Sequence, residues 1–177
     1  MSDEENEFIK GDAGASNIEL NEAGRRKPGS LLMMKGEFPC KVTAFSTAKP
    51  GKHGSAKAMI TGKDIFTDKQ YEETYGTGDM IPCPVVKKTE YTCIDVNEDG
   101  YLMLMTKDGE MKEDLKIDTY DHLKGLEKKI KAIIDAGKKE CLVQVQAWGE
   151  KEQAVDCREG NDQSVSTHTK SCQMLII

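Results

Sequence analysis

The chain has 177 residues, of which 37% are hydrophobic and 32% charged, and its formal net charge at pH 7 is −6. This length predicts one or two domains with buried cores. The sequence lacks an apolar run near the roughly 18 residues of a membrane span, and its acidic N-terminus is unlike a signal peptide, so we expect a cytoplasmic protein with no membrane partner.

The charges are unevenly distributed along the chain. The net charge is −6 over residues 1–24, +6 over 25–88, −6 over 89–157 and zero over 158–177. The stretch between Glu37 and Asp64 contains five lysines and no acidic residue. A local positive excess in an acidic protein indicates a polyanionic partner for that part alone, and RNA is the polyanion that we expect. A solvated basic surface without a partner is the alternative.

Residues 1–24 are acidic, contain glycine and have few large apolar side chains, so we expect a disordered tail. After it, short alternating patterns separated by turn residues predict a small β-barrel over residues 25–87. Pro82 and Pro84 cannot lie in a central strand and indicate that this domain ends close behind them. The expected strands are 31–34, 38–45, 56–61, 71–75 and 80–84, with a turn at 66–69.

Residues 88–157 have the pattern of a second β-domain that contains one helix. Apolar residues share one face of a helix expected over 119–136, and Gly137 is its expected stop. Three strands, a helix and two strands are the order of an OB-fold. The fold class that we expect is therefore mainly β, with two small barrels. The expected strands of the second are 91–96, 101–106, 111–117, 141–148 and 154–157.

Residues 158–177 continue neither pattern. Their serines and threonines are typical of a polar tail, whereas the apolar end from Cys172 to Ile177 is suited to add a strand to an exposed edge. We leave both interpretations of this extension open.

Six cysteines are scattered singly through the chain, with no Cys-x-x-Cys pair and no histidine at ligand spacing. This spacing argues against a zinc site. Thiols in apolar or alternating segments pack as small hydrophobic groups. We therefore expect reduced cysteines in the cores and no metal.

The segment from Ser46 to Lys57 connects two of the expected strands as a hairpin loop. Lys49-Pro50-Gly51-Lys52 fits a type II turn, because proline presets φ at the second position and glycine accepts the positive φ of the third. Lys52 and His53 then project from a thin ribbon of backbone, since Gly54 follows without a side chain.

Three interpretations of this loop compete on residue types. It is a solvated hairpin, a phosphate-binding P-loop or the site of a catalytic lysine. The P-loop pattern fails, because it requires glycine at Ser46 and a hydroxyl residue at His53. A catalytic lysine needs desolvation or a cationic neighbour to lower its pKa, and a polar, glycine-flanked tip offers no dry pocket.

The run from Lys49 to Lys57 closely resembles the modification loop of the eukaryotic translation factor 5A family, which is related to bacterial elongation factor P. In this loop Pro50 stands where the family usually has a small or hydroxyl residue, and Ser55 stands where histidine is usual. The likeness extends over about residues 25–157. Segments in the family's order and spacing are Gly36–Val42, Asp64–Thr67, Pro84–Lys87 and Glu90-Tyr91.

The resemblance implies an SH3-like barrel followed by an OB-fold. It implies that Lys52 is converted to hypusine by deoxyhypusine synthase and deoxyhypusine hydroxylase, with the added group derived from spermidine. The chain itself would then be no enzyme and need no cofactor. Further loop residues would contact transfer RNA, the ribosome or a modifying enzyme, namely Lys49, Gly51, His53, Gly54 and Lys57.

In function, the resemblance implies a ribosome-binding translation factor. From the ribosomal exit site it would stabilise peptidyl-tRNA with the modified lysine, and so promote peptide bond formation at stalled sites such as polyproline, and termination. One alternative is an unmodified RNA-binding double β-barrel protein in which Lys52 is one cation among several. A lysine-dependent enzyme is the remaining alternative.

Overall fold

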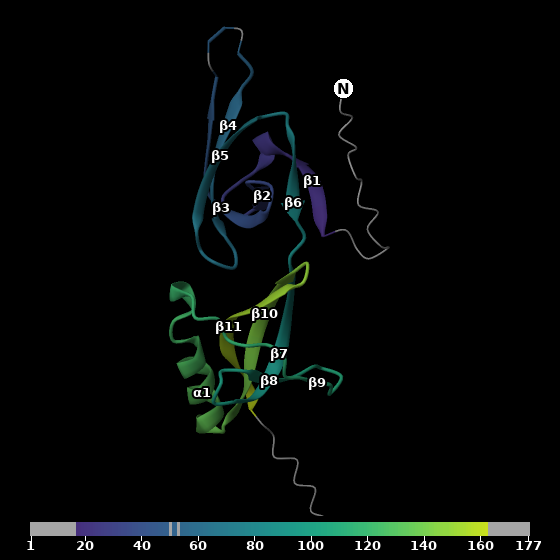
Figure 1. The fold of residues 1–177 in the computed structure, drawn as a ribbon, viewed down its shortest axis with the longest axis vertical. Coiled ribbons are helices and arrows are strands. Elements are labelled where there is room, and N and C mark those ends of the chain that lie inside the picture. The colour runs from purple at the N-terminus through teal and green to yellow at the C-terminus, as the bar shows by residue number, and fades with distance from the viewer. Residues whose placement is uncertain (1–16, 50, 53, 163–177) are drawn as a thin grey trace, which may run out of the picture. The chain divides into compact units, whose positions relative to one another are not determined.

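The computed structural model describes residues 17–49, 51–52 and 54–162. The chain divides into two compact units, drawn in Figure 1. Unit 1 holds the described residues up to Lys87 together with Ala147–Lys151, and unit 2 holds Lys88–Gln146 and the described residues from Glu152 onward. The described part is built mainly from β-strands, which confirms the expected fold class. No helix within it is long and apolar enough to cross a membrane.

Unit 1 combines a four-stranded antiparallel sheet in the order β2-β3-β4-β5 with a two-stranded sheet of β1 and β6. The five strands predicted between residues 31 and 84 are confirmed, and β3 continues beyond its predicted end at Phe45 to Ala48. The bounds are β1 (Ile18–Glu22), β2 (Leu31–Met34), β3 (Phe38–Ala48), β4 (Lys57–Asp64), β5 (Gln70–Gly76) and β6 (Met80–Pro84).

The core of unit 1 follows from the alternation of its strands. Cys40 and Val42 on β3 and Ala58 and Ile60 on β4 are buried, because every second side chain of a strand points to the same face. The core is completed by Ala23, Leu32, Met34, Ile81 and Cys83.

The acidic N-terminal segment is only partly a tail. The predicted disorder of residues 1–24 is wrong from Ile18 onward, because β1 forms there and a 3₁₀ turn follows at Ala23–Arg25. Antiparallel pairing with β6 satisfies the backbone groups of β1 that face β6, and the side chain of Ala23 is fully buried. Such a strand cannot be recognised from its polar composition, because it becomes ordered by pairing with a strand far along the chain. Residues 1–16 lie outside the described part.

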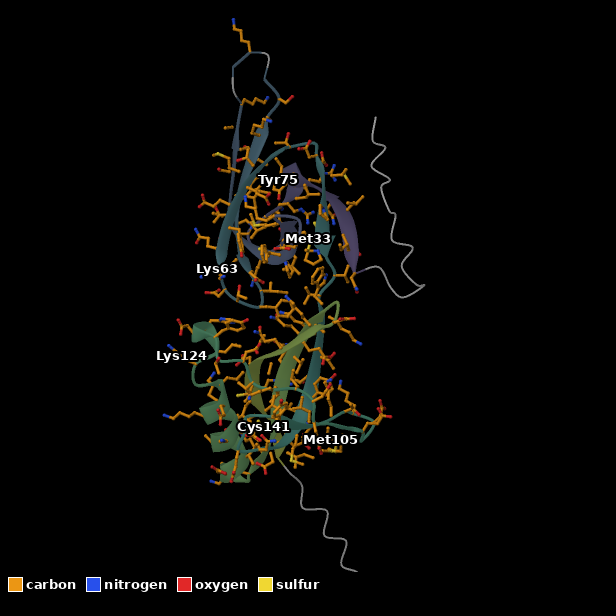
Figure 2. All side chains as sticks on the ribbon, viewed as in Figure 1. Met33, Lys63, Tyr75, Met105, Lys124 and Cys141 are labelled. Atoms are coloured by element: carbon orange, nitrogen blue, oxygen red, sulfur yellow. The ribbon has the colours of Figure 1, made fainter. Side chains whose placement is uncertain are left out.

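Unit 2 is built around a five-stranded sheet in the order β11-β10-β7-β8-β9. Its core lies between this sheet and helix α1, and Cys141 sits among the closely packed side chains there, as Met33 does in unit 1 (Figure 2). The bounds are β7 (Lys87–Val96), β8 (Leu102–Met105), β9 (Met111–Lys112), α1 (Leu126–Ala136), β10 (Lys139–Trp148) and β11 (Lys151–Asp162).

The helix is shorter than predicted. It begins at Leu126 and not at residue 119, because Gly125 takes a left-handed φ of 88° that separates it from a 3₁₀ turn at Asp121–Leu123. The predicted stop is confirmed, since Gly137 has a φ of 62° and its N–H donates to the carbonyl of Ile134. Glycine favours this left-handed position after a helix.

Two strand predictions in unit 2 also need correction. The strand expected over 111–117 is interrupted: it pairs with β8 at Met111–Lys112 and again at an isolated bridge between Lys116 and Tyr101, and the side chains of Leu115 and Ile117 enter the core. The last strand does not end at Cys157 but continues as β11 to Asp162. Part of the expected extension, residues 158–162, therefore belongs to unit 2. Residues 163–177 lie outside the described part.

The five described cysteines are buried and unpaired, which confirms the prediction of reduced core cysteines for these five. Burial raises the pKa of the thiols of Cys40 and Cys93 to about 12 and that of Cys141 to about 11. Such thiols stay protonated at neutral pH, so they behave as apolar packing groups. Cys172 lies outside the described part.

Candidate functional site

The candidate site is the β3–β4 hairpin, which extends beyond the rest of unit 1 in Figure 1. A β-bulge in β3 lies at its base: Val42 pairs with Gly62 and Ala44 pairs with Thr61, so that Thr43 is the extra residue. A bulge bends its strand and increases the local twist. It also shifts the inward-facing positions of β3, because Val42 is buried before the bulge and Phe45 packs on the core after it.

Gly62 lies opposite this bulge, where a larger residue would not fit. A Cβ atom at this position would be 2.9 Å from the sulfur of Met34 and 3.2 Å from the Cβ of Cys40. Both neighbours are core side chains, so they have little freedom to move. The bulge and the glycine therefore act together to set the direction in which the hairpin leaves the core.

The two strands of the hairpin are supported unequally. β4 pairs with β5 from Lys63 as far as Lys57, which lies opposite Gly76, and the N–H of Thr77 donates to the carbonyl of Ala56 at 3.0 Å. β3 is paired with β2 only as far as Lys41. The outer part of β3 therefore depends on β4 alone, which holds the loop from one side.

The loop itself starts beyond the last strand pair, Ala48 with Lys57. Gly51 has a φ of 72°, the positive value that the sequence predicts at this position, and its N–H donates to the carbonyl of Lys49 at 3.1 Å. Pro50 and His53 lie outside the described part, so the predicted type II turn and the projection of His53 stay predictions. Gly51, Lys52 and Gly54 are all exposed.

Lysines dominate the electrostatics of the hairpin. Lys49, Lys52 and Lys57 are exposed, and no carboxylate of the described residues lies within ion-pair distance of them. By contrast, Lys63 at the opposite end of β4 is paired with Asp68 at 3.0 Å. The positive charge near the loop is therefore available to a negatively charged partner.

The exposure of Lys52 bears on the chemistry that this amine can perform. A lysine nucleophile is activated by a hydrophobic pocket or by an adjacent cation that lowers its pKa. Lys52 is exposed, so the described residues do not enclose its side chain in a hydrophobic pocket. The arrangement suits an amine that is presented to another macromolecule better than one that attacks a small substrate.

The structure thus brings the predicted residues Lys49, Gly51, Lys52, Gly54 and Lys57 together on one hairpin. Sequence reasoning did not identify the supporting features, which are the bulge at Thr43 and the contact from Thr77. A glycine inside a strand pattern often marks a bulge, so Gly62 carried a signal for the first of them.

Two family models match the chain. The model described as "Translation initiation factor 5A-like, N-terminal" matches residues 16–79, which contain the candidate hairpin. The model described as "Eukaryotic elongation factor 5A hypusine, DNA-binding OB fold" matches residues 85–158. Both units of the structure are therefore covered.

Whole-chain comparisons give the same result. The chain is 40% identical to eukaryotic translation initiation factor 5A-1 of Arabidopsis thaliana over 86% of its own length and 94% of the relative. It is 44% identical to eukaryotic translation initiation factor 5A-1 of Medicago sativa over 70% of its own length and 77% of the relative. It is similar in structure to a translation initiation factor 5A family protein from Naegleria fowleri, with a TM-score of 0.71, 40% identity and coverage of 81% and 99% of the two chains.

Proposed function

Because this chain belongs to the translation initiation factor 5A family, we propose that it is a ribosome-binding factor that acts through a hypusine side chain on Lys52. The observation that carries this proposal is the position of Lys52: it is exposed in a loop beyond the last strand pair of a hairpin, among lysines that no described carboxylate neutralises. An amine in this position is accessible to a modifying enzyme before assembly and to RNA afterwards.

The modification is a transfer followed by a hydroxylation. Deoxyhypusine synthase transfers the aminobutyl group of spermidine to the Nζ of Lys52, so that a C–N bond of spermidine breaks, a new C–N bond forms and 1,3-diaminopropane leaves. Deoxyhypusine hydroxylase then converts a C–H bond of the added group to C–OH, with dioxygen as the oxidant. The product keeps the positive charge of the lysine, gains a second amine and reaches farther from the backbone. Two cationic amines and a hydroxyl can make charge-assisted hydrogen bonds to phosphate oxygens within one narrow site.

The remaining loop residues have supporting roles in this proposal. Lys49 and Lys57 flank the tip and supply positive charge for transfer RNA, ribosomal RNA or an acidic surface on the synthase. Gly51 and Gly54 keep the ribbon thin, so that Lys52 and His53 are the side chains that enter the target site.

The factor acts from the ribosomal exit site on peptidyl-tRNA in the neighbouring site. Peptide bond formation requires the reacting groups to be held in a productive orientation, and orientation effects on reaction rates can be large. Proline is rigid and aligns poorly, so consecutive prolines stall the ribosome. A hypusine side chain that steadies the acceptor end restores the orientation and promotes elongation and termination, while the ribosome remains the catalyst.

Unit 2 contributes to binding in a different way. Its residues 89–157 have a net charge of −6, and this negative charge disfavours tight binding to the phosphates of an RNA backbone. The OB-fold therefore contacts ribosomal protein or a limited RNA surface, and the positive charge for RNA is concentrated on unit 1.

The proposal is tested by the mass of the Lys52 peptide from the native source, together with ribosome function in cells that carry only Lys52→Arg. We expect hypusine on Lys52, and we expect the variant cells to translate consecutive prolines poorly. The second candidate, an unmodified RNA-binding double barrel, is favoured by the un-neutralised lysines and gives the opposite result. In that case Lys52 is unmodified and Lys52→Arg retains function. The affinity of the protein for RNA then only weakens as the salt concentration rises.

A further inference from the structure

Strand β8 of unit 2 has apolar side chains on both of its sides. Leu102 and Leu104 point inward and are fully buried in a core that includes residues of helix α1. Because successive side chains of a strand alternate, Met103, Met105 and the preceding Tyr101 point outward; Met105 is labelled in Figure 2. The solvated side of an antiparallel sheet usually has polar residues. The outward side of β8 departs from this pattern.

Neighbouring strands extend the apolar surface. Met105 lies opposite Met111 on β9, so these two side chains share the outward side. On β7, Ile94 is the extra residue of a β-bulge and its exposed side chain is also on the outward side. The exposed fractions are 45% for Ile94, 37% for Tyr101 and 48% for Met111. We call the set Ile94, Tyr101, Met103, Met105 and Met111 the methionine face. Apolar side chains that gather on one exposed surface mark an interaction site.

The dimensions of the methionine face suit an α-helix. It spans three strands, and the outer two of three neighbouring strands are roughly 10 Å apart, which is about the diameter of a helix. From Tyr101 to Met105 a strand advances roughly 14 Å, the length of about nine helical residues. An amphipathic helix binds through apolar residues that repeat over about this length. Methionine side chains are unbranched and polarizable, so they can adapt to such a partner.

Acidic residues surround the methionine face. Residues 94–114 contain seven acidic and two basic residues, which gives a net charge of −5. Lys112, one of the two basic residues, is already paired with Asp114 at 2.9 Å and with Glu152 at 2.8 Å. The acidic residues lie in the bulge of β7, in the turns at both ends of β8 and directly after β9. All seven are exposed, and we call them the acidic rim: Asp95, Glu98, Asp99, Asp108, Glu110, Glu113 and Asp114.

The acidic rim determines which partner fits. The second and third strands of an OB-fold, here β8 and β9, are a common binding surface for oligonucleotides. The negative charge at this surface disfavours phosphates. It also disfavours a second copy of the chain, because two acidic rims would meet. A protein segment with lysine and arginine beside its apolar residues is attracted instead.

We propose that the methionine face binds a basic amphipathic helix of a partner protein. The apolar side of the helix packs on Met103, Met105 and Met111, and its cationic side chains pair with the acidic rim. This interaction goes beyond the proposed function and requires neither a modified Lys52 nor a ribosome. Either of the two proposals can therefore fail without the other.

Methyl NMR of the full chain tests this site with a synthetic peptide as the probe. The methionine methyl groups are labelled with ¹³C and assigned through single Met→Leu variants. The probe has about 14 residues, with leucine on one side of its helix and lysine on the other. We expect saturable shifts of the signals of Met103, Met105 and Met111. Met59 on β4 of unit 1 is also 48% exposed, and its signal should not shift.

Two variants with the same substitution measure the contribution of the face. Met111→Lys replaces an apolar contact with a charge that repels the probe, so we expect the affinity to fall about tenfold. Met59→Lys makes this change at equal exposure outside the face and should leave the affinity unchanged. Thermal unfolding checks that both variants are folded. Glu110→Lys reverses one charge in the turn after β8 and should weaken binding severalfold at low salt, with a smaller effect at high salt.

Control ligands distinguish the possible occupants. The same peptide with glutamate in place of lysine, or with serine in place of leucine, should cause no saturable shift. Binding of either control as tightly as the probe overturns the inference. It is also overturned if oligouridine, or a higher protein concentration without peptide, shifts the signals of the methionine face, because RNA or a second copy is then the occupant. The absence of shifts with the lysine–leucine probe, or equal affinity of folded Met111→Lys and Met59→Lys, overturns it as well.

Discussion

Arg158 on β11 donates two hydrogen bonds to the carboxylate of Glu90 on β7, with Nε–Oε1 at 2.7 Å and Nη2–Oε2 at 2.9 Å. The two residues are 68 positions apart in sequence. The pair therefore joins the first strand of unit 2 to the residues beyond the predicted end of this domain. These hydrogen bonds also lower the pKa of Glu90.

The first prediction concerns the pH dependence of this pair. A carboxyl group whose pKa is lower in the folded state stabilises the fold above its unfolded pKa, and this contribution is lost as the pH falls through the folded value. Arg158→Gln should therefore lower the free energy of unfolding at pH 7, by a small amount because both side chains are partly exposed. The difference from the parent should shrink below about pH 4.

Urea unfolding at pH 7 and pH 3 measures this difference. Lys139→Gln serves as the control, because the Nζ of Lys139 contacts the carboxylate of Glu159 on β11 at 2.9 Å and both side chains are exposed. It should have a smaller effect than Arg158→Gln at pH 7. An equal loss at both pH values for Arg158→Gln would show that the pair is not responsible.

The second prediction concerns the base of the hairpin. Gly62→Ala should destabilise unit 1 by about 1–3 kcal/mol, because the added methyl overpacks the core between Met34 and Cys40. Gly78→Ala is the matched control, since a Cβ at Gly78 meets no heavy atom within 4 Å, and its effect should stay within about 0.5 kcal/mol. Chemical denaturation measures both. Equal stability of the two variants would mean that the bulge region adapts freely.

The third prediction separates position from charge in the loop. Lys52→Arg keeps a cation but removes the amine that we propose as the acceptor of the aminobutyl group, so we expect no modification and loss of polyproline translation. Lys57→Arg keeps the charge at the last strand pair of the hairpin and should retain most activity. A polyproline reporter and intact mass measure the two outcomes. Comparable activity of both variants would favour the unmodified RNA-binding candidate.

The fourth prediction concerns thiol reactivity. At pH 8 the buried thiols of Cys40, Cys93 and Cys141 should resist iodoacetamide in the folded protein, because burial raises the pKa of each and restricts access. They should react fully after denaturation. Peptide mass spectrometry before and after unfolding distinguishes the two states. Rapid labelling of Cys40 in the folded protein would contradict the buried position of this side chain.

Much of this fold could be predicted from local sequence patterns. Alternation identified β3 and β4, glycine identified the stop of the helix, and a nonapeptide identified the loop with Lys52. These features are readable because each depends on residues close together in the chain. The family resemblance supplied the two-domain order and the expected modification.

The features that were not predicted depend on distant partners. β1 is acidic and short, and it is ordered because β6 pairs with it. Leu115 and Ile117 alternate like a strand and their backbones hydrogen-bond to Leu102 and Gly100, but the pairing is interrupted between Lys112 and Lys116. At the candidate site, the bulge at Thr43 requires knowledge of the strand opposite it. Sequence reasoning therefore identified the loop residues that we propose as partner contacts, but it did not identify the bulge that sets the direction of the hairpin.

The paired strands between the bulge and Ala48 also limit how the reach of the loop can change. Inserting two residues into each strand would carry the tip roughly 7 Å farther and leave its orientation unchanged, because side chains repeat every two residues. Inserting one residue into each would add roughly 3.3 Å and turn the tip to the opposite face. The reach of the hairpin can therefore change without reversing the tip only when each strand gains or loses an even number of residues.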